Sequence, residues 1–205
     1  MSSRAEQREK TRQAILQAGL DVASEQGMSA LSLREVTRRA GVAPATFYRY
    51  FVDIDDLGLA LVDQVGLSLR QMMRQARHRV KIKGSVVRTS IATFMEFMDH
   101  SPQLFRMLLA DRSGGPRAIR DALQKEKQMF IDELIVDLTR DEQSQVDPLA
   151  HIPVLAEMMV NLIFDGGVEA IELSKPERQI VAEKLVLELK IILSGGRTMA
   201  KQERK

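Results

Sequence analysis

Apolar residues recur with helical spacing along nearly the whole chain, and no segment shows the strict alternation that a half-buried strand requires. Glycine, proline and serine interrupt this periodicity at intervals and mark the ends of successive helices. The pattern therefore predicts an all-α fold of about nine helices without a sheet. The 205 residues are enough for one or two compact domains with cores of their own.

The N-terminal region carries the signals of three helices separated by tight turns. A periodic segment over 6–26 ends at Gly27, and the sequence SLRE at 32–35 is a capping box that starts a short second helix. Gly41 ends the second helix, and Pro44 suits the first position of a third. Two short helices joined by a glycine turn are a helix-turn-helix arrangement, which makes this region a candidate DNA-binding domain.

The third helix of this region, predicted over 44–50, has side chains that suit a major groove. Thr46 and both tyrosines can bond phosphates, and Arg49 can reach a phosphate or a guanine edge. Phe47 and Phe51 lie four positions apart and are expected to face the core. The alternative is a small helical core with a solvated arginine, but two tyrosines beside an arginine favour DNA binding. The residues predicted to contact DNA are Arg12, Ser32, Arg34, Ala43, Ala45, Thr46, Tyr48, Arg49 and Tyr50.

We expect the DNA-binding domain to span residues 1–53 and a larger helical domain to span 54–196. The helices expected in the second domain cover residues 54–82, 85–100, 101–112, about 117–140, 148–173 and 176–194. Gly195-Gly196 is expected to end the last helix, and the basic residues 197–205 to form a flexible tail.

The sequence lacks the residues that several kinds of catalytic, redox and metal-binding chemistry require. The chain has no cysteine, which excludes disulfides, thiolate metal sites and thiol nucleophiles. Its three histidines lack the spacing of metal ligands, and no phosphate-loop or nucleophile-elbow motif occurs. We therefore expect no enzymatic activity, no metal and no cofactor. Without a secretory apolar stretch or a run of about 18 apolar residues, we expect a cytoplasmic protein with no membrane span.

The N-terminal motifs resemble those of the TetR family of transcriptional regulators. The matching features are Gly27, the sequence LSLREV at 31–36, AGV at 40–42 and YRYF at 48–51. The resemblance implies a DNA-binding domain followed by an all-helical domain that binds a ligand and forms dimers. One departure concerns residues 52–57 (VDIDDL), which lack the lysine with which the family usually contacts phosphate at this helix start.

Five segments resemble more closely the FabR group within that family, which represses genes of unsaturated fatty-acid synthesis and senses long-chain acyl thioesters. These segments are residues 32–36, 47–49, 55–59, 69–77 and 93–97. The resemblance implies an acyl-CoA or acyl-carrier-protein effector and a pseudo-palindromic DNA operator near fatty-acid synthesis or desaturation genes. The effector could either promote or release DNA binding.

An acyl effector needs an apolar tunnel in a helical bundle and a site for its polar head. Residues 70–90 hold seven arginines and lysines and no acid, and part of them forms one helical stripe. This stripe could meet DNA, coenzyme A phosphates or an acidic carrier protein, or be a solvated face, and its distance from the DNA-binding helices favours the effector. Phenylalanine and methionine at helical spacing are usually ordinary core. The predicted effector residues are Arg70, Arg74, Arg77, Phe94, Phe97, Met98, Phe105, Leu108, Met129, Phe130, Met159 and Phe164.

The last two helices are the expected homodimer face, because both are rich in apolar residues. The small pair Gly166-Gly167 could allow two helices to pack closely between subunits, or could make a contact within one subunit. Two other functions stay open for the whole chain. One is a TetR-type regulator of efflux or other metabolism with a different apolar ligand, and the other is a helical acyl-CoA carrier without a regulatory role.

Overall fold

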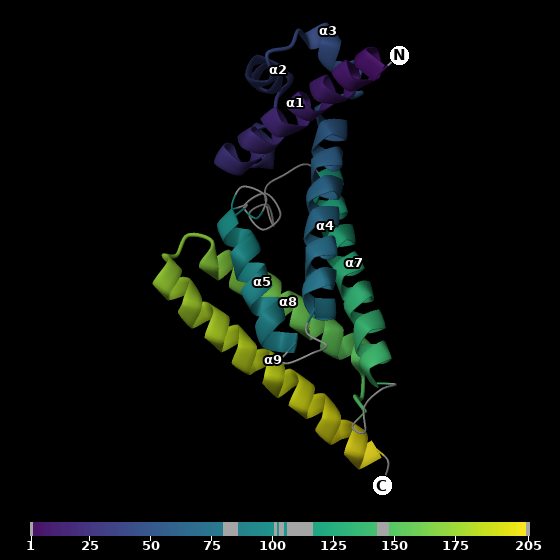
Figure 1. Cartoon of the computed structure of the whole chain (residues 1–205), viewed down its shortest axis with the longest axis vertical. Coiled ribbons are helices and arrows are strands. Elements are labelled where there is room, and N and C mark those ends of the chain that lie inside the picture. The colour runs from purple at the N-terminus through teal and green to yellow at the C-terminus, as the bar shows by residue number, and fades with distance from the viewer. Residues whose placement is uncertain are drawn as a thin grey trace. The chain divides into compact units, whose positions relative to one another are not determined.

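The computed structural model describes residues 2–79, 86–100, 102, 105, 117–142 and 148–203. The described residues form eight α-helices and one 3-10 helix and contain no strand, which confirms the predicted all-α fold (Figure 1). They divide into two compact units: Met1–Ser68 with Ser101–Gln124, and Leu69–His100 with Lys125–Lys205. None of the described helices is long and apolar enough to cross a membrane.

The first unit contains the N-terminal helices and the start of the long helix that follows them. Its elements are α1 (Ser2–Gln26), the 3-10 helix Met28–Ala30, α2 (Leu33–Ala40), α3 (Pro44–Phe47), the first half of α4 (Ile54–Arg79) and the start of α7 (Arg117–Glu142). Gly27 and Gly41 have φ angles of 86° and 65°, so both predicted helix ends use a positive φ that glycine favours. A fully buried core joins these elements through Ile15, Val22, Val36, Phe47 and Leu57.

The predicted helix over 44–50 is α-helical only over Pro44–Phe47. The chain then continues as tight turns, in which the amide of Arg49 donates to the carbonyl of Thr46 at 3.2 Å and that of Tyr50 to Phe47 at 2.9 Å. These tighter bonds still coil the chain in the same direction. The segment therefore keeps its side chains on a helix-like surface although the α-helix itself is shorter than predicted.

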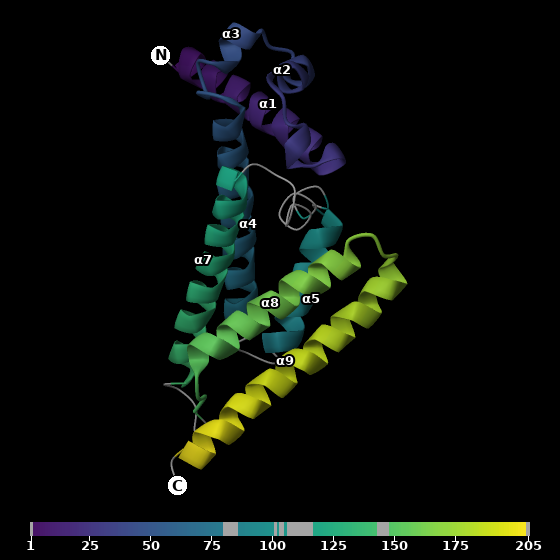
Figure 2. The ribbon, with the colours of Figure 1, turned by 180° about the vertical axis from the view of Figure 1, so that it is seen from behind.

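The second unit contains the rest of α4 together with α5 (Val86–His100), most of α7 (Arg117–Glu142), α8 (Ile152–Ala170) and α9 (Lys175–Glu203). Helices α8 and α9 lie side by side in both views (Figures 1 and 2). A Cβ atom on Gly166 of α8 would lie 2.8 Å from the Leu185 side chain of α9, so this glycine allows close packing within one subunit.

Two predicted helix ends in this unit are wrong. Helix α8 begins at Ile152 rather than at 148, and just before it the amide of Ala150 donates to the carbonyl of Gly196 at 3.1 Å, outside the helical pattern. Helix α9 continues through the glycine pair as far as Glu203, so the expected tail is helical over most of its length. Gly196 allows α9 to pack closely against α8, since a Cβ atom on Gly196 would lie 2.5 Å from Leu155.

The turn between α8 and α9 is fixed by the half-buried Arg178. Its Nε donates to the carbonyls of Ala170 at 3.0 Å and Leu173 at 2.9 Å, and its Nη2 donates to the carbonyl of Ile171 at 3.2 Å. The same guanidinium forms an ion pair with Asp99 at the end of α5. One side chain thus satisfies the free carbonyls at the end of α8 and ties the turn to a third helix.

Candidate nucleic-acid interface

The aromatic side chains that were predicted to face the core anchor the helix-turn-helix. Phe47 is fully buried and Phe51 is nearly so, which confirms that they face inward. Their ring centroids are 5.6 Å apart, and the ring of Tyr48 meets Phe47 edge-on at 5.6 Å. Between α2 and α3, the amide of Val42 donates to the carbonyl of Thr37 at 3.0 Å and fixes the turn. The segment after Ala43 is therefore held firmly at its buried side.

The structure leaves all nine predicted DNA contacts exposed or half-buried within the first unit. The exposed ones are Ser32, Arg34, Ala43, Ala45, Tyr48 and Arg49, and the half-buried ones are Arg12, Thr46 and Tyr50. The guanidinium groups of Arg34 and Arg49 have no ion-pair partner among the described residues. Positive groups free of carboxylates are available to phosphates and base edges, so the geometry suits the predicted role.

The capping box at the start of α2 is only half formed. The Oγ of Ser32 accepts from the amide of Glu35 at 3.3 Å, as predicted, but the Glu35 carboxylate turns to two arginines. It accepts from Arg38 at 2.6 and 3.0 Å and from Arg39 at 2.7 Å, while Arg39 also donates to Glu25 of α1 at 2.8 Å. These bonds, that of Arg38 first, lower the pKa of Glu35 to about 2. The network keeps α2 attached to α1.

Sequence reasoning missed Arg38 and Arg39, although a signal was present. Both follow Glu35 at the three- and four-residue spacings that bring side chains together on a helix. Arg38 is 65% exposed despite its ion pair, so it adds a cation to the surface of α2. Arg39 acts within the protein, where its guanidinium bridges two carboxylates of different helices.

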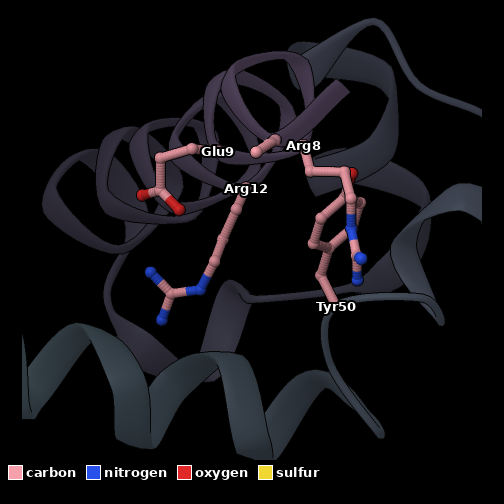
Figure 3. A pocket seen from close by; sticks show the side chains of 5 residues that line it. Arg8, Glu9, Arg12 and Tyr50 are labelled. Carbon is pink, nitrogen blue, oxygen red and sulfur yellow. The ribbon is translucent and has the colours of Figure 1, made fainter. Parts of the chain in front are cut away.

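A groove lies between the N-terminal part of α1 and the end of the segment that follows α3 (Figure 3). Its walls are formed by Ala5, Arg8, Glu9, Arg12 and Tyr50. The guanidinium carbon of Arg12 lies 5.8 Å from the centre of the Phe51 ring, which is the range of a cation–π contact. The predicted contacts Arg12 and Tyr50 are thus brought together, and Arg8 joins them.

This N-terminal region also matches a known family. Residues 15–61 match the family described as bacterial regulatory proteins, tetR family. Over these residues the chain is similar to that family. The predicted resemblance is confirmed at this level, and the motifs that carried it lie on α2 and on the turns around α3.

Solved structures share the TetR fold over most of the chain. SCO4454, a TetR-family transcriptional regulator from Streptomyces coelicolor, is 21% identical, with a TM-score of 0.73 over 96% of both chains. SmeT in complex with triclosan is 20% identical, with a TM-score of 0.72 over 90% of both chains. EbrR, a multidrug binding protein complexed with malachite green, is 16% identical, with a TM-score of 0.68 over 89% of this chain and 97% of EbrR. At these identities the likeness concerns the fold alone.

In the C-terminal part of the chain, basic residues of the segment 70–90 form ion pairs with carboxylates of the protein itself. Arg70 is buried and pairs with the buried Glu126, and its Nε lies 3.5 Å from Glu133. Arg74 donates to Glu133 at 2.7 Å, and Arg88 pairs with a carboxylate of α9 at 2.5 Å. Three of the seven cations therefore have anions already, which removes the main argument for an external anion there. The side chains of Arg77, Arg79, Lys81 and Lys83 lie outside the described residues.

Most of the apolar residues predicted to meet an effector are buried. Phe94, Phe97, Met98, Phe105, Phe130 and Met159 are buried, Met129 and Phe164 are half-buried, and Leu108 lies outside the described residues. Phe130 and Phe164 meet edge-on at 5.5 Å, and the Arg70 guanidinium lies 5.9 Å from the Phe130 ring. Burial fits an ordinary core as well as a ligand site, so the effector role of these residues stays a prediction. The described residues contain no group of three or more potential metal ligands.

Proposed function

We propose that the protein is a transcriptional repressor that reads a pseudo-palindromic operator with residues 44–50. The observation that carries this proposal is the exposed, unpaired Arg49 beside Tyr48, on a segment whose buried side is fixed by Phe47. A fixed segment can present Arg49 to a guanine edge, while Tyr48 and Arg34 donate to flanking phosphates. Base contacts would give specificity and the phosphate contacts would set the register on the duplex.

We further propose that two copies associate through α8 and α9. Apolar side chains remain exposed on both helices, namely Val154, Met158, Val168, Ile180, Leu187 and Ile191. On α9, Ile180, Leu187 and Ile191 recur at helical spacing and form one stripe. Leu155 and Leu185 of the same two helices are instead buried within the subunit. A second copy would cover the stripe and place two recognition segments on successive half-sites.

Replacing Ile191 by lysine is expected to dissociate this dimer. The side chain is 61% exposed in the single chain, and a two-fold interface would bring both new ammonium groups into an apolar contact. Sedimentation velocity over a concentration series should show a dimer for the wild type and a monomer for Ile191→Lys. Val136→Lys is the matched control, because Val136 is a 55% exposed valine on α7. An Ile191→Lys dimer as strong as that of the control would exclude this interface.

The effector that we propose is a long-chain acyl thioester, which would tie the repressor to fatty-acid synthesis or desaturation genes. Helix α4 suits such coupling, because one continuous helix supplies residues to the DNA-binding unit and to the second unit. An effector that prefers one position of this helix would change operator affinity by its difference in affinity for the two states. Either sign of the response is compatible with this mechanism.

A second candidate is a regulator that responds to aromatic or drug-like ligands. The solved structures of SmeT and EbrR, which have similar folds, contain triclosan and malachite green. In this chain, the edge-on pair of Phe130 and Phe164 offers aromatic surface within the C-terminal unit. The two candidates share the DNA-binding mechanism and differ only in the ligand, so one assay can separate them.

Arg49→Ala is expected to remove most of the preference for the operator over unrelated DNA. A bidentate arginine–guanine contact contributes about 1–3 kcal/mol of discrimination. Mobility shifts with the intergenic regions beside the gene would measure it, at two salt concentrations, for the wild type and the variant. The same gels with palmitoyl-CoA, oleoyl-CoA or triclosan would identify the ligand class that changes the affinity.

Arg117→Ala is the control for this experiment, since it removes an equally charged and highly exposed arginine elsewhere in the first unit. Operator preference that survives in Arg49→Ala would exclude residues 44–50 as the reading segment. A wild type without salt-dependent DNA binding, but with affinity for acyl-CoA, would instead indicate a carrier protein.

A further inference from the structure

Helix α2 carries three arginines and a single carboxylate, and this carboxylate holds two of the three guanidinium groups. The Oε1 and Oε2 atoms of Glu35 accept from the Nη2 and Nε of Arg38 at 2.6 and 3.0 Å. The Oε1 also accepts from the Nε of Arg39 at 2.7 Å. Arg34 has no ion-pair partner among the described residues. Glu35 therefore determines which arginines of α2 are available to a ligand.

Of the two arginines that Glu35 holds, Arg38 is the one that faces solvent. The side chain of Arg38 is 65% exposed, whereas that of Arg39 is 21% exposed and also donates to Glu25 of α1 at 2.8 Å. Arg38 follows Arg34 by four positions, so both guanidinium groups extend from the same side of α2. The first short helix of a helix-turn-helix crosses the DNA backbone, and the proposed function gives Arg34 a phosphate there. Arg38 thus lies beside that surface with its charge already paired.

A DNA phosphate would compete with Glu35 for the guanidinium of Arg38. A guanidinium fork binds a carboxylate or a phosphate through the same pair of N–H groups. Moving Arg38 to a phosphate would therefore break both hydrogen bonds to Glu35 and leave its carboxylate near the duplex, where the two anions repel each other. The bonds from Arg38 and Arg39 lower the pKa of Glu35 to about 2, so the carboxylate stays charged at neutral pH. The ion pair thus opposes a contact that the exposure of Arg38 would otherwise allow.

We propose that Glu35 withholds Arg38 from DNA phosphates and thereby limits the affinity of the protein for DNA of any sequence. This inference rests on the proposed function and adds a residue that acts against binding without itself contacting DNA. Sequence-independent affinity comes from arginines and lysines that neutralise phosphates, and unrelated sites in a genome compete with the operator for the protein. With Arg38 paired, α2 contributes Arg34 to the phosphates, and the choice of sequence is left to Arg49.

Glu35→Gln is expected to tighten binding to a labelled duplex of unrelated sequence by roughly fivefold at low salt, because it releases Arg38. The slope of log affinity against log salt should become steeper by about 1, since one more phosphate is neutralised. Fluorescence anisotropy at several salt concentrations measures both quantities. Glutamine suits the test because it also fits the third position of a capping box. A purely structural role for Glu35, which joins α2 to α1 through Arg39, predicts the opposite sign, namely weaker binding.

Two comparisons test whether the gain in affinity depends on Arg38. Glu25→Gln removes an equal charge, which pairs with Arg39 and not with Arg38, so it should leave the affinity and the slope nearly unchanged. In an Arg38→Gln background, Glu35→Gln should change the affinity by less than about twofold. A general loss of repulsion between the protein and DNA would instead give the same gain in both backgrounds.

Arg38→Gln alone provides a test that does not depend on the Glu35 variant. It should weaken DNA binding less than Arg34→Gln does, because the wild-type Arg38 is withheld by its ion pair. An equal loss in these two variants would overturn the inference, and so would a Glu35→Gln protein that binds DNA no more tightly than the wild type. Either result leaves the proposed function intact. A wild type without salt-dependent DNA binding would overturn the proposed function as well.

Discussion

Arg70→Met should lower the free energy of unfolding by about 3–5 kcal/mol, the range found when one partner of a buried ion pair is removed. Arg70 and Glu126 are 9% and 4% exposed, so the variant leaves a buried carboxylate without its guanidinium. The methionine fills much of the space of the arginine stem, which limits the contribution of a cavity. Urea denaturation followed by far-UV circular dichroism would measure the loss.

Two comparisons separate the buried charge from other effects of this substitution. Arg74→Met removes an arginine one turn further along α4, but Arg74 is 54% exposed, and its pair with Glu133 should contribute less than about 1 kcal/mol. The double variant Arg70→Met/Glu126→Leu removes both charges and should recover most of the stability, because apolar replacements of buried pairs are often neutral. A double variant as unstable as Arg70→Met would show that packing, and not the unpaired carboxylate, causes the loss.

The N-terminal unit could be predicted closely because its signals are local. Gly27 and Gly41 end helices through their own backbone, and Ser32 caps α2 by accepting from the amide of Glu35, three residues away. The inward aromatics follow from the four-residue spacing of Phe47 and Phe51. The error in the length of α3 arose because helical spacing does not distinguish the last α-helical turn from the tighter turns that succeed it.

The C-terminal unit was predicted less well because its decisive contacts join distant residues. The charge of Arg70 suggested an external anion, since nothing local reveals that Glu126 of another helix reaches it. The pair Gly195-Gly196 gives the same sequence signal whether it ends a helix or accommodates Leu155, and here it accommodates Leu155. Apolar residues at helical spacing likewise occur on both the packed and the exposed face of α8 and α9. The sequence alone does not distinguish these two faces, and only the packing of the helices shows which one remains exposed.

Phe47→Ala should destabilise the DNA-binding unit by about 3–5 kcal/mol and abolish operator binding. The ring is fully buried and contacts both Tyr48 and Phe51, so its loss leaves a cavity directly beneath the reading segment. Both tyrosines of the chain lie in this segment, and the chain has no tryptophan. Tyrosine fluorescence therefore follows the unfolding of this unit, while far-UV circular dichroism follows all helices.

Tyr48→Ala provides the comparison that separates anchoring from recognition. Tyr48 is 58% exposed and meets Phe47 only by an edge contact, so its removal should lower the free energy of unfolding by about 1 kcal/mol at most. If Tyr48 contacts a phosphate as proposed, the variant should nevertheless bind DNA more weakly at a temperature where it is fully folded. Phe47→Ala should lose binding together with the tyrosine signal of the folded unit, at a lower urea concentration than the wild type. A Phe47→Ala protein that stays folded and binds the operator normally would show that residues 44–50 do not depend on this anchor.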